Sequence, residues 1–406
     1  MEFSPRIMDR LQDKGDIDVV IGIQTKNVES TILHVMNVVY EGVTRYLSSY
    51  RTLVVVSDGF STDRTTELAE MFDISPVNKI VIEQMGDPGK GNGMRTVIDI
   101  AHELNAIAVG FVDGDLLSIK AEWVQELVRP IVYGRTDLVV PFYVRDKFDG
   151  LITNNLAYPF TMAYYGTDVR QPIGGEFCIS RRLMESLRQH PLFPADFGID
   201  IFITSVAAAE NRRIREAMLG LKLHESTTKY VEPEASIIPM FRNVVRTMFD
   251  LAIYYADKSE SMRHRENSFP DVSDYFGPTP VPVKVDRDKM FSTVVERYAE
   301  YEKIYNKLLP AELVNSIVGF VEDNKAMDAE TWACCVWHIF NEYSREKDIM
   351  LIDALRVIWF ARFVSFYDEC KNMDMLEAEN RIKANALVFN DKMKDILKTD
   401  RLDDHP

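Results

Sequence analysis

The first half of the chain alternates two hydrophobic patterns. Short, continuous apolar runs rich in β-branched residues predict buried strands, and they lie at 18–23, 52–56, 79–83, 108–112, 137–144 and 177–180. Segments whose apolar residues recur every three or four positions predict helices, and they lie at 27–39, 64–72 and 94–103. Strands that alternate with helices at this spacing indicate βαβ units. We therefore predict an α/β fold with a mostly parallel, Rossmann-like sheet flanked by helices.

The second half of the chain follows a helical pattern. From about residue 240 it is rich in helix formers and aromatic residues, and we expect these aromatic side chains to be core. They include Trp332, Trp337, Phe340, Trp359 and Phe363. We expect a catalytic domain over 1–240 and a mainly helical C-terminal domain over 241–406. The aromatic helices also leave a homodimer possible.

Composition narrows the class of protein. The 406 residues are 46% hydrophobic, which is enough for a large core, and they carry a formal charge of -16. That charge argues against nucleic acid or an anionic membrane as a partner. The four cysteines have neither metal-ligand nor disulfide-framework spacing, which fits a reducing compartment. No secretion signal is evident, and no apolar run reaches the roughly 18 residues that span a bilayer. We expect a cytoplasmic protein.

Candidate chemistry begins where the strand at 108–112 ends. Asp113 and Asp115 are separated by one residue, so in an extended segment their carboxylates point the same way. Oxygen ligands of this kind suit Mg²⁺ or Mn²⁺, although Asp-Gly-Asp also forms ordinary turns. His224 follows an apolar alternation and could bind a metal through a ring nitrogen, or be structural.

Other polar residues follow the ends of earlier strands, the edge at which open α/β sheets bind ligands. They are Lys26, Glu29, Asp58 and Lys90. The carboxylate of Asp58 could accept a hydrogen bond from a base or a ribose hydroxyl, or simply cap its loop. The glycines around Lys90 could bring backbone N–H groups and its ammonium to a diphosphate, or form a turn.

Two later motifs combine small residues with carboxylates. In the first, Gln171–Glu176, Gly174 and Gly175 permit a close backbone approach to a ligand. In the second, 196–200, Asp200 stands where a helix would begin. A tight turn and a helix start are the alternatives for these two motifs.

Taken in order, these motifs resemble GT-A glycosyltransferases. More narrowly, residues 18–230 resemble the mannosylglycerate synthases and glucosyl-3-phosphoglycerate synthases, which are retaining enzymes. The ordered motifs are Lys26–Glu29, Ser57–Asp63, Gly89–Gly91, Asp113–Asp115, Gln171–Glu176, Gly198–Asp200 and Lys222–His224. Asp-x-Asp alone is a weak signal, whereas the ordered set is strong. The resemblance implies a metal-dependent hexosyltransferase of compatible-solute synthesis.

The resemblance also assigns roles. Contacts to the sugar nucleotide, of the UDP-glucose or GDP-mannose type, fall to Lys26, Glu29, Asp58, Lys90, Asp113, Gly174, Gly175 and Glu176. The metal ligands are Asp115 and His224, and Asp200 and Lys90 are the catalytic residues. Acceptor contacts fall to Arg145 and Thr153. The implied cofactor is Mg²⁺ or Mn²⁺.

The chain departs from the family pattern at the acceptor. The phosphoglycerate enzymes carry an arginine two residues before the threonine, where this chain has Leu151. This favours D-glycerate over 3-phosphoglycerate, although Lys147 or Arg170 could compensate. A glucosyl-3-phosphoglycerate synthase therefore remains the alternative enzyme, and a non-catalytic sugar-nucleotide-binding regulator the alternative of another class.

Overall fold

The computed structural model describes the chain except for residues 1–2, 4, 13, 226–232, 258–278 and 404–406. The chain divides into two compact units: 1–144 with 173–236, and 145–172 with 237–406. Residues 145–172 thus group with the helical C-terminal part rather than with the expected 1–240 domain. Long-range bonds explain this grouping: Trp332 Nε1 donates to Asn155 O at 2.6 Å, and Arg170 pairs with Glu379.

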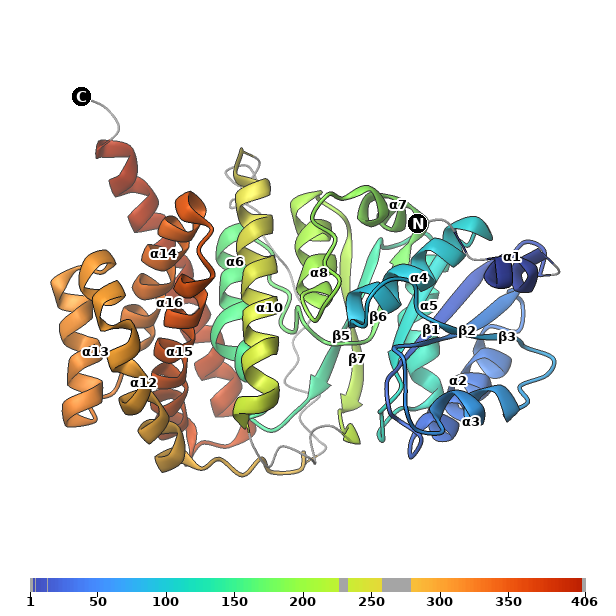
Figure 1. The fold of residues 1–406 in the computed structure, drawn as a ribbon, viewed down its shortest axis with the longest axis horizontal. Coiled ribbons are helices and arrows are strands. Elements are labelled where there is room, and N and C mark those ends of the chain that lie inside the picture. The colour runs from blue at the N-terminus through green and yellow to red at the C-terminus, as the bar shows by residue number, and fades with distance from the viewer. Residues whose placement is uncertain (1–2, 4, 13, 226–232, 258–278, 404–406) are drawn as a thin grey trace. The chain divides into compact units, whose positions relative to one another are not determined.

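A seven-stranded sheet forms the centre of the first unit, in the order β3-β2-β1-β4-β6-β5-β7 (Figure 1). All neighbouring pairs are parallel except those that β6 makes with β4 and β5, so the predicted mostly parallel sheet is confirmed. The strands are β1 (Val19–Thr25), β2 (Thr52–Asp58), β3 (Asn78–Glu83), β4 (Ala108–Asp113), β5 (Leu138–Val144), β6 (Phe177–Ser180) and β7 (Ile214–Leu221).

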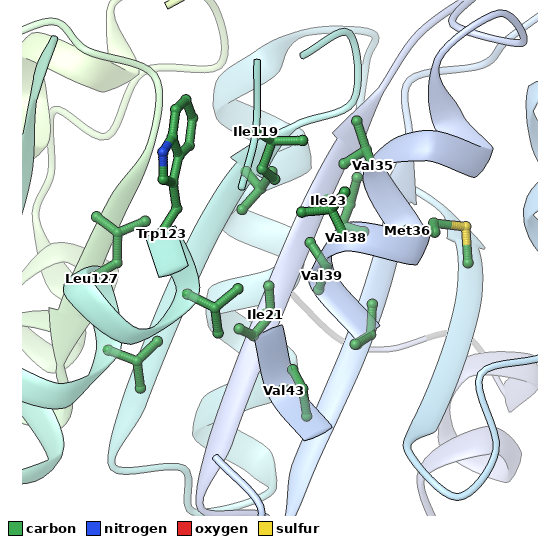
Figure 2. Close-up of a cluster of buried hydrophobic side chains, with 14 of the residues drawn as sticks. Ile21, Ile23, Val35, Met36, Val38, Val39, Val43, Ile119, Trp123 and Leu127 are labelled. Carbon is green, nitrogen blue, oxygen red and sulfur yellow. The ribbon is translucent and has the colours of Figure 1, made fainter. Parts of the chain in front are cut away.

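Helices cover both faces of this sheet. Successive side chains of β1 point to opposite faces, so they contact helices on both sides. Ile21 and Ile23 pack with Val35 and Val39 of α2 (Ile32–Tyr46) and with α5 (Ala121–Val132), as Figure 2 shows. Gly22 faces the other side, where a Cβ would lie 2.7 Å from the Val97 side chain of α4 (Lys90–Glu103). The glycine therefore lets α4 approach the sheet closely.

Helix α4 begins at Lys90, four residues before the start that the periodicity predicts at Met94. Glycine weakens a helix and obscures its pattern, so the first turn, Lys90–Gly93, reads as loop. Other helices that lie wholly within the described part of this unit are α1 (Pro5–Gln12), α3 (Thr65–Met71), α7 (Arg181–Gln189) and α8 (Ile199–Ala209).

The second unit is helical, as predicted. A π-helical turn, η1 (Thr153–Ala157), leads into α6 (Tyr158–Tyr165). The later helices are α10 (Pro233–Tyr254), α12 (Arg287–Leu308), α13 (Ala311–Asp323), α14 (Ala329–Glu346), α15 (Ile349–Cys370) and α16 (Met375–Asp403). The five aromatic residues predicted to be core are all buried. No helix in the described parts of the chain is long and apolar enough to cross a membrane.

Candidate active site

Three of the predicted residues meet at the C-terminal end of β4. Lys90 Nζ lies 3.1 Å from Asp113 Oδ1 and 3.3 Å from Asp200 Oδ1. Asp113 is the last residue of β4, Lys90 is the first of α4, and Asp200 lies in the first turn of α8. The Lys90 side chain is 15% exposed. One ammonium therefore bridges two carboxylates that are far apart in sequence.

Glycines around Lys90 make this bridge possible. A Cβ on Gly89 or Gly91 would overlap the backbone carbonyl oxygens of Ala195 and Pro194. The first turn of α4 thus lies directly against the segment that leads into α8, and Asn92 N donates to Ala195 O at 3.1 Å. The Gly-Lys-Gly motif serves close packing of two backbones, which brings Lys90 to Asp200.

Burial and pairing set the charges of this cluster. Burial opposes charge on Lys90, but Asp113 and Asp200 outweigh it and hold the lysine pKa above its ordinary value. For Asp113, burial is outweighed by Lys90 and Lys222, and the carboxyl pKa is lowered. For Asp200, burial prevails over Lys90, and the pKa is raised. The cluster therefore combines the ammonium of Lys90, which is held in its charged form, with the carboxylate of Asp200, whose charged form is disfavoured by burial.

The motif Gln171–Glu176 ends in a turn beside this cluster. Gly175 has a φ of +93°, and a Cβ there would lie 2.6 Å from Asp113 Oδ2. Gly174 packs so closely on Pro141 of β5 that a Cβ would overlap its ring. Both glycines are therefore required by close approach, Gly175 also by its backbone conformation, and the turn leads into fully buried Glu176.

Two residues that the assigned roles did not include hold Glu176. Lys222 Nζ donates to Glu176 Oε2 at 2.7 Å and to Gly174 O at 2.8 Å, and the Tyr143 hydroxyl donates to the same Oε2. Burial outweighs Lys222 and raises the pKa of Glu176. The sequence signal for Lys222 was its place two residues before His224. Tyr143 gave no signal, since it reads as an ordinary strand residue.

The structure brings Asp115 and His224, the two predicted metal ligands, together. Asp115 Oδ2 is 3.5 Å from His224 Nδ1, and both side chains are about one-fifth exposed. Their segments pair through an antiparallel bridge between Leu116 and His224, and Glu225 N donates to Asp115 O at 2.9 Å. Carboxylate oxygen and imidazole nitrogen suit a divalent metal. Among the residues that the structure describes, no three His, Cys, Asp or Glu side chains gather for one.

The loops after β1 and β2 use their carboxylates internally. Asp58 is buried and accepts hydrogen bonds from Thr25 Oγ1 at 2.9 Å, Ser61 N at 2.8 Å and Ser61 Oγ at 2.6 Å. Glu29 Oε2 accepts from Arg64 N at 2.9 Å, just before α3, whereas Lys26 is exposed. The structure thus gives Asp58 and Glu29 a part in shaping these loops.

The predicted acceptor contacts belong to the second unit. Arg145 and Thr153 flank Gly150: a Cβ there would lie 3.5 Å from Arg145 Nη1 and 3.7 Å from Thr153 Oγ1. Thr153 begins η1, a type of turn that is frequent at functional sites. Lys147 Nζ donates to the backbone oxygens of Met373 and Lys371, the latter at 3.3 Å.

Comparison with known proteins gives a family match over about half of the chain. Residues 14–227 match the model of the mannosylglycerate synthase glycosyltransferase (GT) domain. Similar solved structures include glucosyl-3-phosphoglycerate synthase from Mycobacterium tuberculosis with Mn²⁺, UDP and glucosyl-3-phosphoglycerate. It is 23% identical, the match covers 62% of this chain and 86% of that chain, and the TM-score is 0.46. The same enzyme with Mn²⁺, UDP and phosphoglyceric acid gives 23% identity, 62% and 84% coverage and a TM-score of 0.47. A search of curated proteins found no match.

Proposed function

We propose a specific reaction for this chain, which belongs to the mannosylglycerate synthase family of GT domains and is a sugar-nucleotide-dependent glycosyltransferase. In this reaction it transfers glucose or mannose to D-glycerate, with retention of the anomeric configuration. The donor would be of the UDP-glucose or GDP-mannose type. Acceptor contacts are assigned to Arg145 and Thr153. The cluster of Lys90, Asp113 and Asp200 supports the transfer step.

One observation supports glycerate as the acceptor: the two basic side chains that could bind a phosphate near the proposed acceptor contacts already have partners within the protein. Compensation for Leu151 calls for a basic side chain that can reach an acceptor phosphate without giving up its own buried partner. Arg170 makes two hydrogen bonds to Glu379, at 2.7 and 2.9 Å, and Lys147 is held by backbone oxygens. Leu151 packs against a hydrophobic cluster that includes Phe148. Neither cation that could compensate for Leu151 is available, which favours an unphosphorylated acceptor.

The residues of the chain supply electrostatic stabilisation to the proposed reaction. The C1–oxygen bond to the diphosphate breaks, the bond from C1 to the acceptor oxygen forms, and the leaving phosphate takes the acceptor's hydroxyl proton. Lys90 would stabilise the negative charge that grows on the diphosphate. Asp200 would stabilise the oxocarbenium-like charge that develops on the hexose.

A divalent metal fits the pair formed by Asp115 and His224, because the two side chains offer one oxygen and one nitrogen ligand 3.5 Å apart. When bound, such a metal acts as a Lewis acid that neutralises charge on the leaving group. We further propose a cytoplasmic location, which the four free cysteines support.

A grid of donors and acceptors tests this function. UDP-glucose and GDP-mannose are each incubated with D-glycerate or 3-phosphoglycerate in the presence of Mn²⁺, and the anomeric configuration of the product is read by NMR. We expect an α-linked product from an α-linked donor, and a kcat/KM for D-glycerate at least tenfold above that for 3-phosphoglycerate. A preference for 3-phosphoglycerate would replace this proposal with the alternative enzyme. Binding of sugar nucleotides without product would support a regulator.

Leu151→Arg provides a gain-of-function arm. An arginine at this position should raise kcat/KM for 3-phosphoglycerate by about 10- to 100-fold, since one charge-assisted contact contributes about 1.5–3 kcal/mol. Leu151→Gln is the matched control, because it disturbs the packing of Leu151 without adding charge. Equal gains in the two variants would contradict the electrostatic explanation.

A further inference from the structure

Lys222 lies where two parts of the first unit meet. Its side chain is 5% exposed, and its ammonium contacts Glu176 and Gly174 and lies 4.9 Å from the centre of the Tyr143 ring. The contacts with Gly174 and Glu176 span the turn formed by Gly174–Glu176. A single ammonium therefore fixes both ends of that turn.

The segment that carries Lys222 is itself anchored. Lys222 follows β7 directly, and Leu223 N donates to Ser118 Oγ at 2.8 Å. Leu223 O accepts from Leu117 N at 2.8 Å, and His224 bridges to Leu116. Residues 222–224 thus connect the Gly174–Glu176 turn to the segment that follows Asp115.

Glu176 retains one oxygen for another partner. Tyr143 and Lys222 both donate to Oε2, whereas Oε1 is buried and has no hydrogen-bond partner among the described residues. A buried acceptor without a partner is costly and calls for a ligand. A hexose hydroxyl is a ligand of suitable chemistry.

We propose that Lys222 is the positioning residue of the sugar pocket, which holds the Glu176 carboxylate and the Gly174 carbonyl so that Glu176 Oε1 receives a hydroxyl of the donor hexose. This inference rests on the proposed function. Lys222 acts through Glu176 and makes no contact with the sugar itself. It should therefore affect recognition of the hexose and leave recognition of the nucleoside diphosphate largely unchanged.

The test compares two ligands on the full chain with Mn²⁺ by calorimetry: the sugar nucleotide that the wild type binds, and its nucleoside diphosphate. Lys222→Met should weaken sugar-nucleotide binding by about 10- to 100-fold and nucleoside diphosphate binding by less than about threefold, since losing a charged hydrogen-bond partner costs about 1.5–3 kcal/mol. Lys222→Arg should recover part of the loss. Lys303→Met, at an exposed site on α12, is the matched control and should change neither affinity. If Lys222→Met does not fold, Lys222→Gln is measured in its place.

A double-mutant cycle with Glu176→Gln decides whether Lys222 acts through Glu176. We expect little further loss of sugar-nucleotide binding when Lys222→Met is added to Glu176→Gln. Losses that multiply, or equal losses for both ligands, overturn the positioning role while leaving the proposed function intact. A wild-type chain that binds neither UDP-glucose nor GDP-mannose overturns the proposed function itself.

Discussion

Removing one partner of the buried pair between Arg170 and Glu379 should destabilise the second unit strongly. The two side chains are only 9% and 8% exposed. Arg170 also donates to Asn154 Oδ1 at 2.9 Å, and its guanidinium carbon lies 5.2 Å from the centre of the Tyr158 ring. Glu379→Leu leaves the buried arginine charge without the carboxylate that accepts two of its hydrogen bonds.

The expected cost follows from the burial of the pair. Breaking a buried ion pair by removing one partner costs about 3–5 kcal/mol. At about 2–4 °C per kcal/mol for a unit of this size, the Tm should fall by on the order of 10 °C. Arg170→Met/Glu379→Leu removes both charges at similar volume, so its stability should return to within about 1 kcal/mol of the wild type.

Urea unfolding followed by circular dichroism measures both effects, and kinetics with D-glycerate tests the function assigned to this region. Since Arg170 is engaged by Glu379, the double variant should keep its KM for D-glycerate within about threefold, because no acceptor contact is lost. A double variant as unstable as the sum of its single variants would refute the pairing argument. A large rise in KM would refute the exclusion of Arg170 from acceptor binding.

Three further predictions concern the first unit. Gly175→Ala should destabilise the protein by about 1–3 kcal/mol, because its φ is positive, and should lose most activity, because the added Cβ meets Asp113. Gly134→Ala is the control: its φ is +66° with open space around it, so it should lose stability alone. Equal activity in the two variants, assayed at saturating donor, would contradict this. Burial lowers the pKa of His190, whose Nδ1 accepts from Leu192 N at 3.1 Å. As pH drops below about 6.5, the unfolded chain therefore binds a proton at this histidine before the folded chain does, and the stability should fall. Urea unfolding at pH 7.5 and 5.5 should show a smaller fall for His190→Asn than for the wild type. Asp115→Ala should abolish turnover and weaken Mn²⁺ binding with an unchanged circular dichroism spectrum, and full activity of that variant with EDTA present would show that Asp115 holds no metal.

The hydrophobic pattern predicted the strands of the sheet because the burial of a strand is recorded in the apolar side chains of a few consecutive residues. β2 is buried along its whole length, and its centre, Leu53–Val56, reads as a continuous apolar run. The aromatic residues of α14 and α15 read correctly as core. The start of α4 at Lys90 was not predicted. The glycines of this turn disfavour a helix locally, and only the tertiary structure explains Gly89 and Gly91, which pack closely against 194–195.

The sequence by itself determined which polar groups lie at the strand ends, since a carboxylate after a buried strand must emerge at the edge of the sheet. It therefore indicated Asp113, Asp115 and Lys90. The tertiary structure alone decided what these groups meet, because side-chain partners are chosen by the packing of distant elements. Lys90 and Asp200 are 110 residues apart, and Arg170 and Glu379 are 209 residues apart. No local pattern encodes such pairs, so only the fold shows which charges are already engaged and which remain for a ligand.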